Sequence, residues 1–229
     1  MLTSTPGLVL HTTPYGESSV VARVFTRQLG ARSYMVKGVR TARSRVKQNL
    51  LQPLSSLDMV VYDSLDDTLG HIRELSPRRP VPPPDAVGNA LRFFMTEVLY
   101  RALREAEPMP DFWDYVDQSA SLVQEPVRDI PVRFLLQVSY YLGVSPLDNY
   151  TPHTPYFDLQ LGRFAASPVE TTLSAPLSAS LHAYLTGDPN SEASALRHQL
   201  LDALLAYFQL HLSGFRNFAS HEILHTILR

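Results

Sequence analysis

Ser18-Ser-Val-Val-Ala-Arg-Val-Phe-Thr-Arg27 predicts a β-strand at the centre of a β-rich amino-terminal region. The segment is rich in β-branched residues, which favour the extended backbone of a strand. A period of two places Val20, Ala22 and Val24 on one face, and Phe25 with the arginines on the other. The strand is therefore expected to have an apolar face and a basic face.

Comparable segments lie on both sides of this strand, and turn-forming Pro and Gly residues separate them. We expect strands at residues 7–13, 18–27, 31–37, 49–62 with an interruption at Pro53, and 68–75. Several short strands without an intervening helix are typical of a small barrel or sandwich. The first domain is therefore expected at residues 1–76.

Pro77-Arg-Arg-Pro-Val-Pro-Pro-Pro84 is too rich in proline for a helix or a central strand, and it predicts a stiff linker. Beyond it the hydrophobic period becomes helical. Helices are expected at residues 85–107, 110–117, 131–143, 176–185, 193–212 and 220–228. Residues 85–229 should thus form a helical domain that carries an irregular hairpin near residues 149–172. The fold class is α+β with two domains.

Composition excludes several classes of protein. The 229 residues include no cysteine, so disulfides and cysteine-based zinc or iron–sulfur sites are excluded. Neither a secretory signal nor an apolar run of about 20 residues is visible. Phosphate-binding glycine loops of nucleotide-dependent enzymes are absent as well. We expect a cytoplasmic protein without a cofactor, a membrane segment or an enzymatic activity.

The positive charge is concentrated in one part of the chain. Of 20 basic residues, eight lie between Ser18 and Leu57, where none of the 22 acidic residues occurs. Such a local positive field predicts a polyanionic partner, although a solvated surface is the alternative. The candidate phosphate ligands are Arg23, Arg27, Arg32, Lys37, Arg40, Arg43, Arg45 and Lys47. Phe25 and Tyr34 lie among them and suit either base stacking or, as we favour, the core.

His221-Glu-Ile-Leu-His225 matches the H-E-x-x-H pattern of zinc hydrolases. In those enzymes a third metal ligand lies downstream, but only residues 226–229 follow here. We interpret the match as a coincidence and expect no metal site, with a zinc hydrolase as the enzymatic alternative.

Several ordered motifs resemble the RecO family of recombination mediators. They are Tyr15-Gly-Glu-Ser-Ser19, Phe25-Thr26, Gly30, Lys37-Gly-Val-Arg40, Leu51-Gln-Pro-Leu54, Ile72-Arg-Glu74 and, near the carboxy terminus, Leu205-Ala-Tyr-Phe-Gln-Leu-His-Leu-Ser-Gly-Phe-Arg216 followed by Ser220. The resemblance implies an OB-fold followed by a helical domain. It implies binding of single- and double-stranded DNA, annealing of complementary strands, and recombinase loading with RecR and, in many bacteria, RecF. A different OB-type protein that binds single-stranded nucleic acid is the alternative.

The resemblance also implies contact with the acidic tail of single-strand-binding protein through the helical domain. The candidate anchors are Arg101, Arg104, Arg128 and Arg133. Many members of the family carry a four-cysteine zinc ribbon where this chain has residues 149–164 without cysteine. We expect packing of Tyr156, Phe157, Leu159, Leu161 and Phe164 to hold that hairpin in place of the metal.

Overall fold

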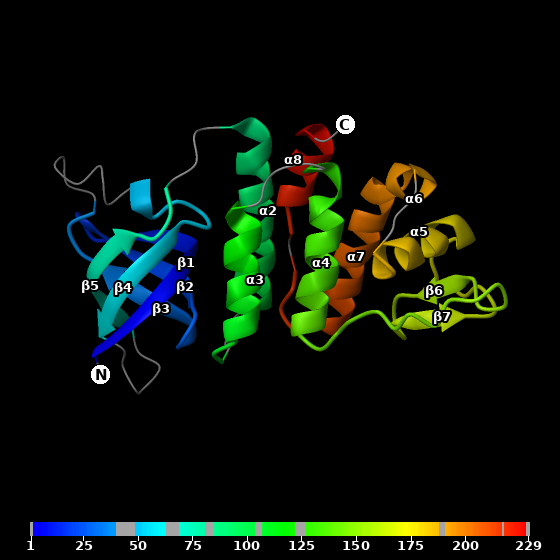
Figure 1. Cartoon of the computed structure of the whole chain (residues 1–229), viewed down its shortest axis with the longest axis horizontal. Helices are drawn as coiled ribbons and strands as arrows, with labels where there is room; N and C mark the ends of the chain where they lie inside the picture. Colours follow the sequence, from blue (N-terminus) through cyan, green and yellow to red (C-terminus); the bar gives the residue numbers. More distant parts are fainter. Residues whose placement is uncertain are drawn as a thin grey trace. The chain divides into compact units, whose positions relative to one another are not determined.

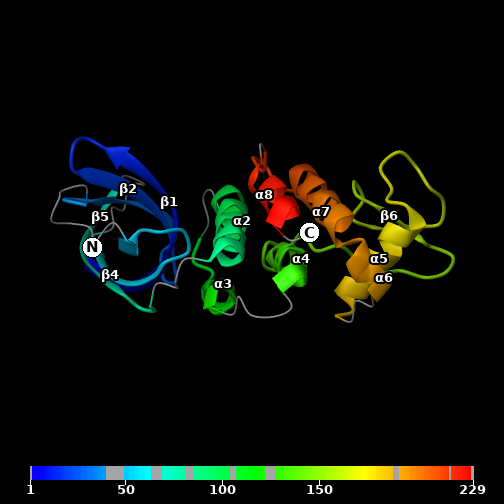
Figure 2. The ribbon, with the colours of Figure 1, turned by 90° about the horizontal axis from the view of Figure 1, so that it is seen from above.

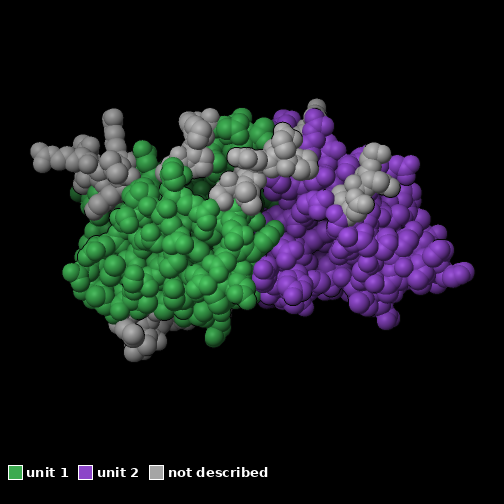
Figure 3. Space-filling view, in the orientation of Figure 1, with its two compact units in different colours: residues 1–123 green, residues 124–229 purple. Residues whose placement is uncertain are grey.

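The computed structural model forms two compact units, residues 1–123 and 124–229, which Figure 3 shows in different colours. The structure describes residues 2–39, 49–62, 69–80, 85–103, 107–121, 127–187, 191–216 and 218–227. Unit 1 contains a barrel together with helices, and unit 2 contains helices together with a small hairpin.

A closed barrel of five strands forms the first part of unit 1 (Figures 1 and 2). Its strands are β1 (Leu2–Tyr15), β2 (Ser19–Thr26), β3 (Gly30–Val36), β4 (Ser56–Tyr62) and β5 (Gly70–Pro77). The order around the barrel is β1-β2-β3-β5-β4, with β4 pairing back to β1. All pairs are antiparallel except β3 with β5, which is parallel. This closed five-stranded arrangement is the OB-fold expected from the resemblance.

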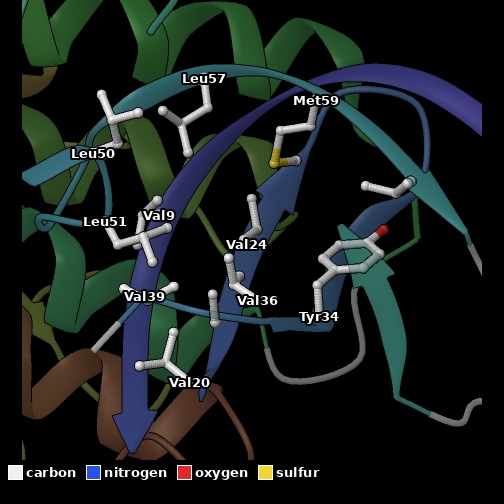
Figure 4. Close-up of a cluster of buried hydrophobic side chains, with 12 residues drawn as sticks. Val9, Val20, Val24, Tyr34, Val36, Val39, Leu50, Leu51, Leu57 and Met59 are labelled. Carbon is white, nitrogen blue, oxygen red and sulfur yellow. The ribbon is translucent and has the colours of Figure 1, made fainter. Parts of the chain in front are cut away.

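The predicted apolar face of β2 lines the core of the barrel. Val20 and Val24 contribute to a buried cluster with Tyr34, Val36 and Met59, which Figure 4 shows in close-up. Val20 lies opposite Val36 in the ladder, so the period of two brings inward residues of neighbouring strands together. Tyr34 is fully buried, which confirms its assignment to the core.

The expected strand at residues 49–54 is wrong. Residues 49–50 are helical and residues 51–54 form turns, so β4 begins only at Ser56. Leu54 adopts a positive φ of 55°, which a strand residue cannot have. Leu50 and Leu51 are nevertheless buried against the barrel core. A short apolar run of this kind fits a buried helical turn as well as a strand.

Two helices pack within unit 1 after the barrel: α2 (Ala86–Ala102) and α3 (Pro110–Ser121). The Asp85 side chain accepts a hydrogen bond from Gly88 N, as expected of a helix cap. Helix α3 joins the barrel through Trp113, whose Nε1 donates to the Phe25 carbonyl at 2.8 Å. The Phe25 ring lies 5.6 Å from the ring of Phe112. Phe25 therefore belongs to the core between β2 and α3.

Unit 2 contains several helices and a small hairpin. Its elements are the 3₁₀ turn η1 (Val127–Asp129), α4 (Ile130–Tyr141), β6 (Tyr156–Asp158), β7 (Arg163–Ala165), α5 (Ala175–Leu185), α6 (Ser191–Ala195), α7 (Arg197–His211) and α8 (Ser220–Ile227). The helix expected over residues 193–212 is interrupted at Leu196, between α6 and α7. Among the described helices, none is long and apolar enough to cross a bilayer.

The compact units do not follow the division predicted from the proline-rich segment. Pro77 ends β5, residues 81–84 lie outside the described residues, and α2 and α3 group with the barrel rather than with the later helices. The domain ranges 1–76, 77–84 and 85–229 remain a prediction. The division into compact units shows that the helices up to residue 123 pack with the barrel.

Candidate nucleic-acid interface

The outer face of the barrel presents polar side chains in rows across neighbouring strands. His11 of β1 pairs with Arg23 of β2, and Arg23 pairs with Ser33 of β3. Directly paired residues point to the same side of a sheet, so these three side chains form one row. Their row faces away from the core that Val24 and Tyr34 line. In OB-folds the face of strands 2 and 3 is the usual site for oligonucleotides.

A cleft of about 230 Å³ opens on this face, and helix α2 supplies one of its walls. Its lining residues are His11, Thr13, Val21, Arg23, Ser33 and Tyr100. Arg23 donates from Nη2 to the Leu103 carbonyl at 3.2 Å and from Nη1 to Ser33 Oγ at 3.4 Å. These bonds hold the guanidinium between the barrel and the end of α2.

A larger groove of about 730 Å³ lies across β3, β5 and β4. Met35 of β3 pairs with His71 of β5, and Lys37 is exposed just after β3. The cations of this groove, Lys37 and Arg73, share it with Asp58 and Glu74. Arg73 Nε is 3.3 Å from Glu74 Oε1, so much of the charge there is internally balanced. Lys37 belongs to the predicted set of phosphate ligands. It is exposed, it follows the last residue of β3, and it lines this groove.

Arg27 is tied to helix α3 rather than to the cleft. Its Nε and Nη2 each donate to a carboxylate oxygen of Asp114, both at 2.8 Å. The hydrogen bond from Arg27 lowers the pKa of the Asp114 carboxyl, and the charge of Arg27 adds to that effect while burial opposes it. Asp114 in turn raises the pKa of the Arg27 guanidinium. This cation is matched by an anion of the same unit.

The other predicted phosphate ligands do not line the cleft or the groove in the part of the chain that the structure describes. Arg32 lies opposite Val24 and donates from Nε to the Leu29 carbonyl at 3.1 Å, near the end of the barrel. Arg40, Arg43, Arg45 and Lys47 lie outside the described residues. The structure thus brings Arg23 to the cleft and Lys37 to the neighbouring groove.

The candidate anchors for the acidic tail divide between the units. Arg101 pairs with Glu97 on α2, with Nη2 and Oε1 2.7 Å apart, whereas Arg104 lies outside the described residues. Arg128 and Arg133 are exposed in unit 2, and Arg133 lies 5.8 Å from the centre of the Tyr184 ring. Burial, followed by the hydrogen bond to Asp129, raises the pKa of Tyr184 to about 12. Tyr184 therefore stays neutral beside Arg133.

Residues 149–164 hold their shape by packing and hydrogen bonds, and they offer no thiolate for zinc. Phe157 and Phe164 are buried with ring centroids 5.0 Å apart, as expected. Leu161, by contrast, is 59% exposed at the turn, so its predicted packing is wrong. Asp158 Oδ1 accepts hydrogen bonds from Gln160 N, Leu161 N and Thr171 Oγ1 at 2.8, 3.1 and 2.9 Å.

The carboxyl of Asp158 also shows how this hairpin tolerates a buried charge. Burial alone would raise its pKa. The hydrogen bonds from Leu161, Thr171 and Gln160 and the charge of Arg163 outweigh burial and hold the pKa below its ordinary value. The charged carboxylate, with three hydrogen bonds to Oδ1, closes the hairpin turn in a chain whose sequence excludes a cysteine-bound metal.

The H-E-x-x-H segment lies on α8 and contacts α7. His225 Nε2 is 3.0 Å from Asp202 Oδ1, and its ring centroid lies 4.9 Å from that of His198. Within the described part of the chain, no group of three or more His, Asp and Glu side chains is arranged to hold a metal ion. The contacts made by His225 are those of a helix packed on its neighbour.

Of the six residues that line the cleft, sequence reasoning predicted only Arg23 as a ligand, and those it missed include His11, Ser33 and Tyr100. Alternation could have placed Ser33 on the outer side, because Ser33 precedes core-facing Tyr34. It could not have placed His11 there, because a β-bulge between Val9 and His11 shifts the register of β1. Tyr100 could not have been found this way, since only the packing of α2 brings it to β1 and β2.

Comparisons with known proteins agree with the geometry of the barrel. Residues 1–81 match the family model described as recombination protein O N terminal. The chain is 29% identical to the DNA repair protein RecO of Phocaeicola vulgatus over 98% of both chains. It is 28% identical to that of Porphyromonas gingivalis over 99% of both chains, and 24% identical to that of Flavobacterium psychrophilum over 98% of both.

Proposed function

Because the chain belongs to the RecO family of DNA repair proteins, we propose that it is a non-enzymatic mediator that binds DNA through the outer face of its barrel. The single observation that carries this proposal is the position of Arg23. Its guanidinium is held in an open cleft on the strands that OB-folds use for oligonucleotides. In this role the protein binds single- and double-stranded DNA and anneals complementary strands.

The phosphate ligands of this proposal are chosen by their surroundings. Arg23 and Lys37 are included because they lie at the cleft and groove. Arg32 pairs with core-facing Val24 and so lies on the inner side of the sheet, and it remains a candidate on its sequence alone. Arg40, Arg43, Arg45 and Lys47 follow Lys37 in the sequence and extend the same positive segment. Arg27 is assigned to the α3 contact, since its charge is matched by Asp114.

Partners and location follow from the family. The proposed partners are RecR, RecF in some settings, and the acidic tail of single-strand-binding protein, with recombinase loading as the outcome. Arg128 and Arg133 suit an acidic tail because both are exposed cations of unit 2, and Arg101 and Arg104 remain candidates. We place the protein in the cytoplasm, with the nucleoid.

Fluorescence anisotropy of a labelled single strand across a salt series tests the DNA site. Counterion release predicts that affinity falls with salt, with a slope of about −0.7 per contacted phosphate. Annealing of strands coated with single-strand-binding protein tests the mediator role separately. Binding without annealing of coated strands would favour a simple single-strand-binding OB protein instead.

A further inference from the structure

The aromatic rings of Phe25 and Tyr34, on the strands of the barrel, are not available to stack on bases. Both are fully buried, one against α3 and the other inside the barrel. Proteins that bind single strands without sequence preference usually combine cations with exposed aromatic rings. A DNA site on the face of β2 and β3 therefore needs a ring from another element.

Helix α2 supplies such a ring at the cleft. Tyr100 is 41% exposed, and its ring centroid lies 5.0 Å from that of His11 on β1. The two rings are tilted by 44°, so His11 supports Tyr100 without stacking flat against it. The cleft they share measures about 230 Å³, which is smaller than the roughly 300–1,000 Å³ of typical small-molecule pockets. A single planar base suits a hollow of this size.

The end of α2 also fixes the cation of the cleft. Leu103, whose carbonyl accepts from Arg23 Nη2, lies about one helical turn beyond Tyr100. The same turn of helix therefore holds the guanidinium and carries the phenol ring, and both line the cleft. A planar guanidinium can meet a phosphate or the edge of a base, while the ring meets a base face.

We propose that Tyr100 and Arg23 form a subsite for one unpaired base of single-stranded DNA, with Tyr100 as the stacking platform. This inference rests on the proposed DNA-binding function and adds the residue that selects unpaired bases. A base in a duplex already has both faces stacked, so the subsite favours single strands. Helix α2 thereby supplies the exposed ring that the strands do not, since Phe25 is buried against α3 and Tyr34 is buried inside the barrel.

Two oligonucleotides of equal length and charge test the subsite: oligothymidine and a strand of abasic sites. The wild-type protein should bind oligothymidine more tightly, and Tyr100→Leu should lose about fivefold or more of that preference. Tyr100→Phe should retain it, because the ring remains. Phe93→Leu is the matched control: Phe93 is 53% exposed on the same helix but lines a separate hollow beside Leu57 and Pro80.

The outcomes separate this inference from the proposed function. If the wild-type protein fails to bind oligothymidine at all, the DNA-binding function itself is wrong. If the wild-type protein binds oligothymidine, the two variants are compared by how much more tightly each binds oligothymidine than the abasic strand. The same ratio for Tyr100→Leu and Phe93→Leu would show that the stacking subsite is wrong. Quenching of a 2-aminopurine base by the wild-type protein gives a second readout that does not depend on any variant folding. Absence of quenching at every position of a bound strand would also overturn the subsite.

Discussion

Arg27 and Asp114 form a two-pronged ion pair across 87 residues of sequence, with both N–O distances at 2.8 Å. Arg27 follows β2 and Asp114 lies on α3, so the pair joins the barrel to the helix that also buries Phe25. A run of cations in a sequence can thus contain members with different tasks. This one positions a helix, whereas Arg23 lies in the cleft.

Disrupting that pair should lower the melting temperature of unit 1 modestly, because both side chains remain partly exposed. Arg27→Gln and Asp114→Asn should lower the melting temperature by similar amounts. The melting temperature of the double variant should be little lower than that of either single variant. Differential scanning calorimetry checks this cycle. Fully additive decreases would mean that the two side chains act independently.

The same pair predicts a dependence on pH. The folded-state pKa of Asp114 lies below its ordinary value of 3.8, so its stabilising effect is present above that value. The effect disappears as the pH falls through the lowered pKa. The difference in melting temperature between wild type and Asp114→Asn should therefore shrink in strong acid. A difference that grows as the pH falls would contradict this assignment.

Asp117 is expected to matter more for stability than the exposed pairs. It is 4% exposed on α3 and accepts hydrogen bonds from Ser56 Oγ at 2.7 Å and Arg79 Nη2 at 2.6 Å. Asp117→Ala leaves both donors without this acceptor and should cost about 1–3 kcal/mol. Urea unfolding followed by the emission of Trp113, the single tryptophan, measures the change.

The pair of Arg78 and Asp58 is the control for that experiment. Their side chains are 42% and 54% exposed, and exposed pairs contribute about 0–1 kcal/mol. Asp58→Ala should therefore change the unfolding free energy less than Asp117→Ala. Equal changes in the unfolding free energy for the two variants would show that the burial of Asp117 does not increase its contribution to stability.

The hairpin of unit 2 should be insensitive to metal chelation. Packing of Phe157 on Phe164 and the three hydrogen bonds to Asp158 hold it, and residues 149–164 include no cysteine. We expect the same melting temperature with and without a chelator. Phe157→Ala should cost about 3–5 kcal/mol, since the ring is fully buried. A lower melting temperature on chelation, with metal recovered from the protein, would refute this account.

Much of the barrel could be predicted from alternation, and the failures of that rule have physical causes. The register of β2 with β3 follows from a period of two that places Val20, Val24 and Tyr34 inside. Residues 49–54 were beyond that rule, because a buried helical turn and a strand can share the same short apolar run. Strand β1 extends from Leu2, before Pro6, although a proline usually argues against a strand.

The site was predictable only in part. The basic face of β2 placed Arg23 correctly on the outer side, yet nothing local marks Arg27 as different from it. That difference depends on Asp114, which folding brings to Arg27 from a distant helix. Tyr100 likewise has the pattern of an ordinary helical residue until α2 packs beside β1. Packing between elements, rather than patterns within them, decides which side chains line the cleft.

The most direct test of the central claim is the salt dependence of single-strand binding by matched charge variants. Arg23→Gln combined with Lys37→Gln should weaken binding and flatten the slope of log affinity against log salt by about 0.7 for each phosphate that the variant no longer binds. Arg27→Gln removes one cation of the same segment but should leave the slope unchanged, because Asp114 already matches that charge. Equal slopes for the wild type and the Arg23 and Lys37 variant would contradict a DNA site on the outer face of the barrel.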